Sequence, residues 1–99
     1  MLEEQKPLIS IIVPCFNEEE VLPIYIKAME DIIDRMKTAR VELIFVDDGS
    51  TDGTAEMLRQ FHSRRQNYRY LSFSRNFGKE AAMYAGMQAA LGDYVAVMD

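Results

Sequence analysis

The sequence is poor in the features that mark secreted or membrane-spanning chains. It has one cysteine, Cys15, which cannot form an internal disulfide and fits a reducing compartment. Its setting in "SIIVPCF" is typical of a small apolar residue at a strand end, with a reactive thiol as the alternative. No apolar run approaches the ~20 residues needed to cross a bilayer. The segment "MLEEQKP" lacks the basic region and apolar stretch of a signal peptide, so we expect no secretion by that route.

Basic residues are also in the minority. The chain has 11 Lys and Arg against 16 Asp and Glu, which gives a net charge of -5 at pH 7. No lysine or arginine run stands out, so we expect no binding to DNA or RNA. Hydrophobic residues make up 48% of the chain and charged residues 27%, a globular balance that excludes disorder, collagen and a disulfide scaffold. A length of 99 residues suits one small domain or part of a larger one.

Four short apolar runs have the length and composition of strands, at 8–13, 41–46, 70–73 and 94–98. Between the first two, apolar residues recur at steps of three and four, which predicts one face of a helix. These residues are Leu22, Tyr25, Ile26, Met29, Ile32, Ile33 and Met36. Two more helices are predicted over 52–64 and 78–91. This alternation predicts an α/β fold, a Rossmann-like parallel sheet with flanking helices.

The ends of these elements carry further expectations. Asn17 is expected to cap the first helix with Glu20 three residues on, and Thr51 to cap the second. The last run, "YVAVMD", is expected to be a central strand, and no helix follows to cover it. We therefore expect a tail over 1–7, and over 8–99 part of a longer domain that is truncated at its C-terminal end.

Polar segments follow each predicted strand. In an open parallel sheet, ligands bind beyond the carboxyl ends of the strands, where the strand order reverses. The segments that should share this edge are "PCFNEE" (14–19), "DDGSTDG" (47–53), "SRNFGKE" (74–80) and Asp99. The sequence thus places its candidate site along one rim.

Asp47 and Asp48 form an acidic pair at the end of the second run. Two adjacent carboxylates repel each other unless hydrogen bonds or positive charge compensate them. Helix capping is one interpretation, and it is favoured for Asp52, but capping needs one acceptor and not a pair. The functional interpretation is that the pair accepts hydrogen bonds from a nucleobase or ribose, or helps to hold a divalent metal. Gly49 would let the backbone approach such a ligand closely.

Arg75 and Lys79 surround a glycine at the start of the third predicted helix. Basic side chains and free backbone N–H groups together suit an anion such as phosphate. The alternative is a solvated basic pair that partners Glu80. Glu18, on the same rim, is either a residue of a helix's first turn or part of the site. Neither a Walker loop nor GxGxxG is present, so the usual nucleotide signatures do not apply.

Four segments in this order resemble the N-terminal part of inverting family 2 glycosyltransferases with a GT-A fold. They are "IIVPCFNEEE", "FVDDGSTDGT", "SRNFGKEAAMYAGMQAA" and "GDYVAVMD". The resemblance runs from Leu8 to Asp99 and is nearest to polyprenyl-phosphate sugar transferases, namely bactoprenol glucosyltransferases and dolichol-phosphate mannosyltransferases. It implies that this chain is the nucleotide-sugar-binding half of such a domain.

The resemblance also implies roles for individual residues, none of them catalytic. It implies a nucleobase site made by Pro14, Phe16, Asn17, Glu18 and Asp47, with Asp48 and Gly49 close by. It places Arg75, Gly78 and Lys79 near the nucleotide and its phosphates. Asp99 matches the first acid of a DxD motif, whose later acid binds Mg²⁺ or Mn²⁺ across the diphosphate. The metal would neutralise charge on the departing diphosphate.

The implied reaction passes a sugar from a nucleotide diphosphate to a polyprenyl (undecaprenyl) phosphate with inversion. We lean to UDP-glucose, with GDP-mannose and a UDP-N-acetylhexosamine as alternatives. The resemblance implies C-terminal membrane helices beyond Asp99, which place the full-length protein on the cytoplasmic face of the plasma membrane. The acceptor side would also lie beyond Asp99, so we expect this chain alone to be soluble and not to turn over substrate.

Three alternatives stay open. One is a hydroxyl-directed family 2 enzyme of polysaccharide synthesis. Another is a phospho-accepting receiver module, although there the acidic pair would follow the first strand and the lysine would end a late strand. The third is a folded module that only partners a missing half; its exposed sheet edge would favour self-association into a homo-oligomer.

Overall fold

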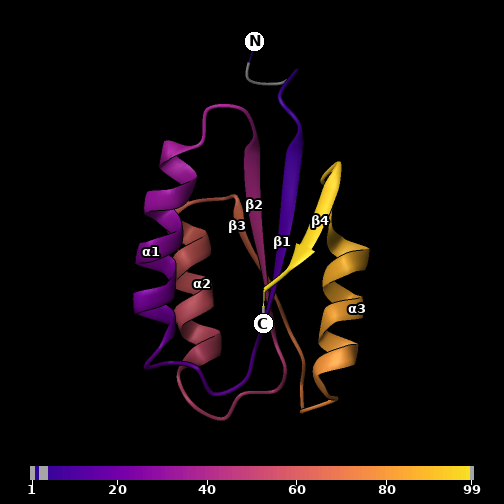
Figure 1. Cartoon of the computed structure of the whole chain (residues 1–99). Helices are drawn as coiled ribbons and strands as arrows, with labels where there is room; N and C mark the ends of the chain where they lie inside the picture. Colours follow the sequence, from indigo (N-terminus) through magenta and orange to yellow (C-terminus); the bar gives the residue numbers. More distant parts are fainter. Residues whose placement is uncertain (1, 3–4, 99) are drawn as a thin grey trace.

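The computed structural model describes residues 2 and 5–98, and in them strands and helices alternate (Figure 1). The strands are β1 (Leu8–Cys15), β2 (Arg40–Asp47), β3 (Tyr68–Ser72) and β4 (Tyr94–Val97). The helices are α1 (Leu22–Arg35), α2 (Thr54–Arg64) and α3 (Lys79–Ala89). Each predicted strand lies within two residues of the observed one at both ends, as do the second and third predicted helices.

The four strands form one parallel sheet in the order β3-β2-β1-β4. Helices α1 and α2 cover one face and α3 covers the other (Figure 1). The predicted α/β parallel sheet with flanking helices is therefore confirmed. After β1 the chain first adds β2 and β3 on one side and then crosses to place β4 on the other. The strand order thus reverses at β1, next to the candidate site residues.

Each face of the sheet has its own apolar core. Under α1 and α2, Phe45 packs edge-on against Tyr25 at 6.2 Å between ring centroids, and Leu58 is buried beside it. Under α3 the residues are smaller. Gly86 lies so close to the sheet that a Cβ there would stand 2.4 Å from Cγ2 of Ile12. Small side chains on α3 therefore allow this helix to lie close to the sheet.

Asn17 and Thr51 are not the caps that the sequence predicts for the first two helices. Val21 precedes α1 and Gly53 precedes α2, and neither makes a side-chain capping bond. Asn17 lies five residues before α1 begins at Leu22, with a left-handed φ of 51°. Its side chain bonds to the loop after β2 instead, because that loop offers donors that local spacing cannot reveal.

One further expectation is wrong. The spacing places Ile32 on the apolar face of α1, but Ile32 is 53% exposed, since it lies at the margin of the apolar stripe. Among the described residues β4 is an edge strand that pairs with β1 alone, and its central place in a longer sheet stays a prediction. Within the described residues, no helix has the length and apolar character needed to cross a membrane.

Candidate functional site

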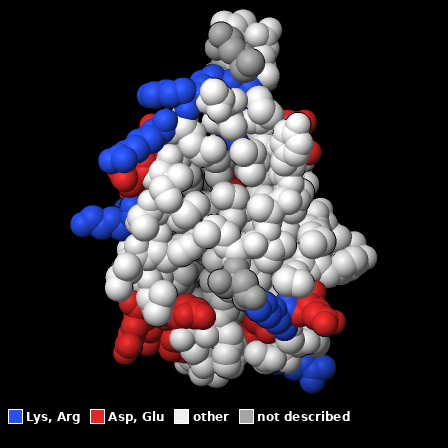
Figure 2. All heavy atoms as spheres, in the orientation of Figure 1, with Lys and Arg blue, Asp and Glu red and all other residues white. Residues whose placement is uncertain are grey.

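Three loops meet at the carboxyl end of the sheet. The parallel register places Cys15, Asp47 and Ser72 in one row, so the connections after β1, β2 and β3 leave the sheet at the same edge. We call this edge the rim, made of residues 14–21, 47–53 and 72–79. Acidic side chains gather at this lower end of the molecule, with basic groups beside them (Figure 2). The rim therefore presents charge of both signs, mainly negative.

The loops after β1 and β2 are interlocked by hydrogen bonds. Asn17 donates its backbone N–H to Oγ of Ser50 at 2.9 Å, and its Oδ1 accepts the N–H of Thr51 at 2.8 Å. The N–H of Glu18 donates to Oγ1 of Thr54, also at 2.9 Å. These bonds span more than 30 residues of sequence and fix the two loops against each other.

Asp52 has the capping role that the sequence favoured. Its Oδ1 accepts the N–H of Thr54 at 2.9 Å and the Thr54 hydroxyl at 2.6 Å, at the start of α2. The hydroxyl bond is the main cause of a pKa of Asp52 below its usual range. Asp52 is therefore ionised at neutral pH and stabilises the beginning of the helix.

The acidic pair divides into two different environments. Asp47 is 1% exposed, and its two oxygens accept the N–H of Ser50 at 3.0 Å and the hydroxyl of Ser72 at 2.9 Å. This carboxylate joins the loop after β2 to the end of β3. Each of its oxygens retains a further lone pair, so its acceptor capacity is not exhausted.

Asp48 points to the start of α3. Its Oδ1 accepts the N–H of Phe77 at 2.8 Å, and its Oδ2 accepts the N–H of Gly78 at 3.1 Å. For Asp48 the helix-capping interpretation therefore holds, but the helix is α3 and not α2. The charge favours this place because the helix N-terminus carries partial positive charge.

Gly49 lets the loops after β2 and β3 touch. Its φ of 72° lies in the left-handed region, and a Cβ at this position would stand 2.2 Å from the carbonyl carbon of Arg75. Both conditions require glycine. The close approach seen here is made to backbone of the same chain, and the approach to a ligand stays a prediction.

A hollow of about 170 Å³ opens on the rim, and we call it the rim hollow. It is lined by Pro14, Cys15, Phe16, Glu18, Asp48 and Lys79. Five of these six were candidate site residues. Ligand pockets usually measure about 300–1,000 Å³. The rim hollow is therefore large enough for part of a nucleotide and too small for a whole nucleotide sugar.

The other candidates lie around the rim hollow and do not line it. Asn17, Asp47 and Gly49 hold the loops together, as described above. Arg75 lies over the ring of Phe77 at 4.7 Å, and Gly78 lies in the segment bound by Asp48. Asp99 lies outside the described residues. Among the residues that are described, no three His, Cys, Asp or Glu side chains form a group that could hold a metal ion.

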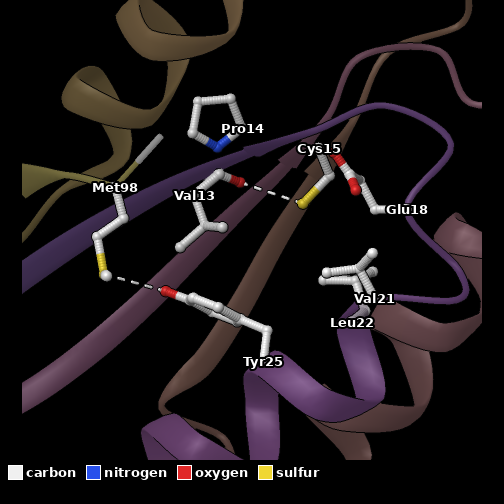
Figure 3. Close-up of a pocket in the computed structure, with 8 residues that line it drawn as sticks. All are labelled: Val13, Pro14, Cys15, Glu18, Val21, Leu22, Tyr25 and Met98. Atoms are coloured by element: carbon white, nitrogen blue, oxygen red, sulfur yellow. Dashed lines mark hydrogen bonds between the residues drawn. The ribbon is translucent and has the colours of Figure 1, made fainter.

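A second, more apolar pocket of about 230 Å³ lies between β1 and α1 (Figure 3). We call it the apolar pocket. Its lining is Val13, Pro14, Cys15, Glu18, Val21, Leu22, Tyr25 and Met98. The Tyr25 hydroxyl donates to Sδ of Met98 at 3.2 Å across its mouth (Figure 3). Pro14, Cys15 and Glu18 therefore separate two hollows of different polarity.

Cys15 is not a nucleophile in this structure. Burial, and then the neighbouring carboxylates of Glu18 and Asp47, raise the pKa of its thiol to about 12. The Sγ donates to the carbonyl oxygen of Val13 at 3.4 Å. Because the thiolate is the reactive form, the interpretation as a small apolar residue is supported.

Sequence reasoning missed three residues that organise the rim. Thr54 links Glu18 to Asp52, Ser72 holds Asp47, and Phe77 gives its N–H to Asp48 and its ring to Arg75. The turn-forming composition of "GSTDGT" marked a loop rich in hydroxyl groups. No local signal connected Ser72 or Phe77 to the acidic pair.

Comparisons with a family model and with known proteins point to the same family. The family model described as "Glycosyl transferase family 2" matches residues 10–99. The prophage bactoprenol glucosyl transferase homolog of Escherichia coli K12 is 41% identical over 91 residues, 92% of this chain and 29% of that protein. The undecaprenyl-phosphate 4-deoxy-4-formamido-L-arabinose transferase of Photorhabdus laumondii is 35% identical over 97% of this chain and 30% of that protein. The chain thus spans less than a third of these relatives.

Solved structures of glycosyltransferases share the fold. The mannosyltransferase PcManGT from Pyrobaculum calidifontis, in complex with GDP-Man and Mn²⁺, superposes with a TM-score of 0.69 at 26% identity. That match covers 91% of this chain and 26% of the other. S. aureus TarS 1-349 in complex with UDP-GlcNAc gives a TM-score of 0.77 at 26% identity, over 92% of this chain and 26% of TarS. The GT-A fold implied by the sequence is confirmed for the part present here.

Proposed function

Because the chain belongs to glycosyl transferase family 2, we propose that residues 8–99 form the nucleotide-sugar-binding half of a polyprenyl-phosphate sugar transferase. The enzyme would pass a sugar, with UDP-glucose as the first choice of donor, to a polyprenyl phosphate with inversion. The relatives named for bactoprenol and for undecaprenyl phosphate support this acceptor class.

The observation that carries the proposal is the convergence of five candidate residues on the rim hollow. Phe16 and Pro14 offer apolar surface, while Glu18 and Asp48 offer acceptor oxygens and Lys79 a positive charge. A nucleotide has the matching parts: a flat ring, polar N–H and hydroxyl groups, and phosphate. We propose that the base and ribose meet the carboxylates and that the phosphates lie toward Lys79 and Arg75.

The burial of Asp47 refines the role that the resemblance implied for it. In the family pattern this acid meets the base, but here its oxygens are bonded to Ser50 and Ser72. We propose that Asp47 supports the base site by holding these loops in place, and that Asp48, which lines the rim hollow, is the acid of the pair nearer to the nucleotide. Asn17 and Gly49 support the same loops.

The acceptor phosphate is already an oxyanion, so the proposed reaction needs little help from a protein base. Positioning of the two substrates and compensation of charge would carry most of the catalysis. The described residues supply the positioning of the donor. The acceptor, attachment to the membrane and location on its cytoplasmic face are proposals for the whole protein, and the relatives' names support the acceptor.

A divalent cation, Mg²⁺ or Mn²⁺, belongs to the proposal through Asp99. It is supported by the match of "VMD" to the start of a DxD motif and by the Mn²⁺ of the PcManGT complex. The described residues do not by themselves form a cation site.

Nucleotide titration of the isotope-labelled 99-residue chain tests the site. We expect UDP or GDP to shift the amide resonances of Phe16, Glu18, Phe77, Gly78 and Lys79, with weak, roughly millimolar affinity because the site is partial. Lys79→Met should weaken these shifts, and Lys27→Met, an exposed lysine on α1, should not. Shifts confined to other surfaces, or equal shifts with inorganic phosphate alone, would contradict a nucleotide site.

An assay of turnover separates the chain from the whole enzyme. We expect no polyprenyl-phosphate sugar from the purified 99-residue chain supplied with UDP-glucose or GDP-mannose, Mn²⁺ and polyprenyl phosphate. The rim hollow is too small to enclose a whole donor, and nothing described faces an acceptor. Synthesis above the level without protein would contradict this expectation.

A further inference from the structure

The end of the sheet opposite the rim contains a buried polar cluster that the proposed function does not use. Glu42 on β2 is 5% exposed, and Ser10 on β1 is 0% exposed. The Ser10 hydroxyl donates to Oε2 of Glu42 at 2.6 Å. Arg69 on β3 donates through Nη1 to Oε1 of Glu42 at 2.8 Å. One carboxylate thus joins three neighbouring strands.

This cluster also holds the turn between α3 and β4. The N–H of Leu91 donates to Oε2 of Glu42 at 2.8 Å, and the N–H of Gly92 donates to Oγ of Ser10 at 2.9 Å. The N–H of Asp93 donates to the carbonyl oxygen of Leu8 at 2.7 Å. Three successive backbone donors are therefore bound to β1 and β2 immediately before β4 begins.

Two more contacts tighten the attachment. Arg69 also donates to the carbonyl oxygen of Ala89, the last residue of α3, at 2.9 Å. Gly92 lies so close to β1 that a Cβ there would stand 2.6 Å from Oγ of Ser10. The turn is therefore packed closely against β1.

Within the described residues, the strand that follows has few other contacts: the N–H of Leu8 donates to Oδ2 of Asp93 at 2.9 Å, and Val97 packs against the core under α3. Tyr94 is 65% exposed and Val95 is 47% exposed, and β4 pairs only with β1 over residues 94–97. An edge strand with exposed side chains has weakly specified register, because a slip exchanges no buried face. A slip of one residue would move the strand end by ~3.3 Å and turn each side chain to the opposite face.

We propose that Ser10, Glu42 and Arg69 form a positioning cluster that fixes the register of β4 on β1. Through that register the cluster sets the place of the strand end, where Met98 lines the apolar pocket and after which Asp99 follows in the sequence. The importance of this for catalysis rests on the proposed function, in which Asp99 belongs to the metal site. The positioning itself does not depend on any ligand.

Amide hydrogen exchange of the 99-residue chain tests the cluster. In Ser10→Ala the N–H of Gly92 loses its acceptor. In Glu42→Gln the N–H of Leu91 and the guanidinium of Arg69 lose their charged acceptor, the carboxylate. We expect exchange at the amides of residues 94–98 to become roughly tenfold faster in both variants. Amides of β2 and β3 should accelerate much less, since the cores on both faces are unchanged.

Matched variants make the result specific. Asp34→Asn also removes a carboxylate that pairs with arginine, but at an exposed site on α1, and should leave β4 unchanged. Gly92→Ala removes no hydrogen-bonding group but crowds Ser10, and should loosen β4 as Ser10→Ala does. If Glu42→Gln does not fold, Ser10→Ala and Gly92→Ala carry the test.

Two outcomes would overturn the proposal. Unchanged exchange at residues 94–98 would show that β4 holds its register without the cluster. Equal acceleration across β2, β3 and β4 would show that the cluster only adds to general stability. Because no nucleotide or metal is present in this experiment, a failure here is distinguishable from a failure of nucleotide binding at the rim.

Discussion

Strands β2 and β4 belong to one sheet but are held in place by different forces. Seven of the eight residues of β2 are buried, since α1 and α2 cover one of its faces and α3 the other. In β4, three of four residues are exposed and the fourth is partly buried. Apolar burial therefore fixes β2, whereas β4 depends on backbone pairing with β1 and on the polar cluster before it.

This difference indicates how changes should propagate. A change in the β2 core should affect the stability of the whole chain, because both apolar cores pack on that strand. A change at β4 should remain local. The proposed site would draw on both strands, since Asp47 ends β2, Asp48 follows it, and Asp99 follows β4 in the sequence. It would then join a rigid support to a more weakly held one.

The largest expected effect comes from removing an aromatic side chain from β2. Phe45 is 1% exposed and packs against Tyr25 and Phe61. We expect Phe45→Ala to lower the free energy of unfolding by about 3–5 kcal/mol, through lost burial and a cavity. Val95→Ala on β4 should change it by only about 0.5 kcal/mol. Urea denaturation of both variants measures this, and similar losses would refute the contrast between the strands.

A smaller loss is expected where the loop after β2 meets the loop after β3. Gly49→Ala combines a left-handed φ with a clash against the backbone of Arg75, and should cost about 3 kcal/mol. Gly78→Ala has a φ of 102° but no atom within 4 Å of the added Cβ, and should cost about 1–2 kcal/mol. Thermal unfolding compares the two. Equal losses would mean that the contact between the loops contributes nothing.

Acid should weaken the cluster that links β2 to β4. Burial of Glu42 favours its protonated form, but bonds from Ser10, Leu91 and Arg69 outweigh burial and hold the pKa of Glu42 below its ordinary 4.5. Its contribution to stability is therefore present above pH 4.5 and is lost as the pH falls through the folded-state value. Denaturation curves between pH 7 and pH 3 should show a smaller acid-induced loss in Glu42→Gln than in the wild type. An equal loss in both would exclude Glu42 from this dependence.

The last prediction involves no change in stability and concerns β1, which lies between the two strands. With the pKa of Cys15 near 12 against an ordinary 9.0, its thiolate fraction at pH 8 is roughly a thousandfold lower than that of a free thiol. We expect a thiol reagent to label the folded chain very slowly and the urea-unfolded chain rapidly. Rapid labelling without urea would show that the apolar pocket opens readily, and that β1 is less firmly covered than β2.

The sequence predicted those parts of the fold that depend on periodicity. The β-branched run that contains Ile44 and Val46, and the three-and-four spacing of Ile26 and Met29, are direct expressions of burial. The prediction for Ile32 was wrong because a residue at the margin of an apolar stripe is buried only if a neighbouring element covers it. The spacing of apolar residues does not show where the contact between α1 and the sheet ends.

The site could be predicted in its location but not in its internal bonding. The parallel topology alone brings Glu18, Asp48 and Lys79 to one edge. The partners of Asn17, Asp47 and Asp48 lie between three and 34 residues away along the chain, and most belong to another loop. Local propensity gave Asn17 a capping role because it considers only the nearest donors, and the tertiary structure offered better ones.

The interlocked loops of the rim limit how this protein can vary in length. Asn17 and Glu18 bind Ser50, Thr51 and Thr54 through paired backbone and side-chain bonds. An inserted or deleted residue in either connection would move the hydrogen-bond donors of one loop away from their acceptors in the other. Insertions and deletions in homologous chains should therefore be rare in these two connections and more frequent in the one between α2 and β3.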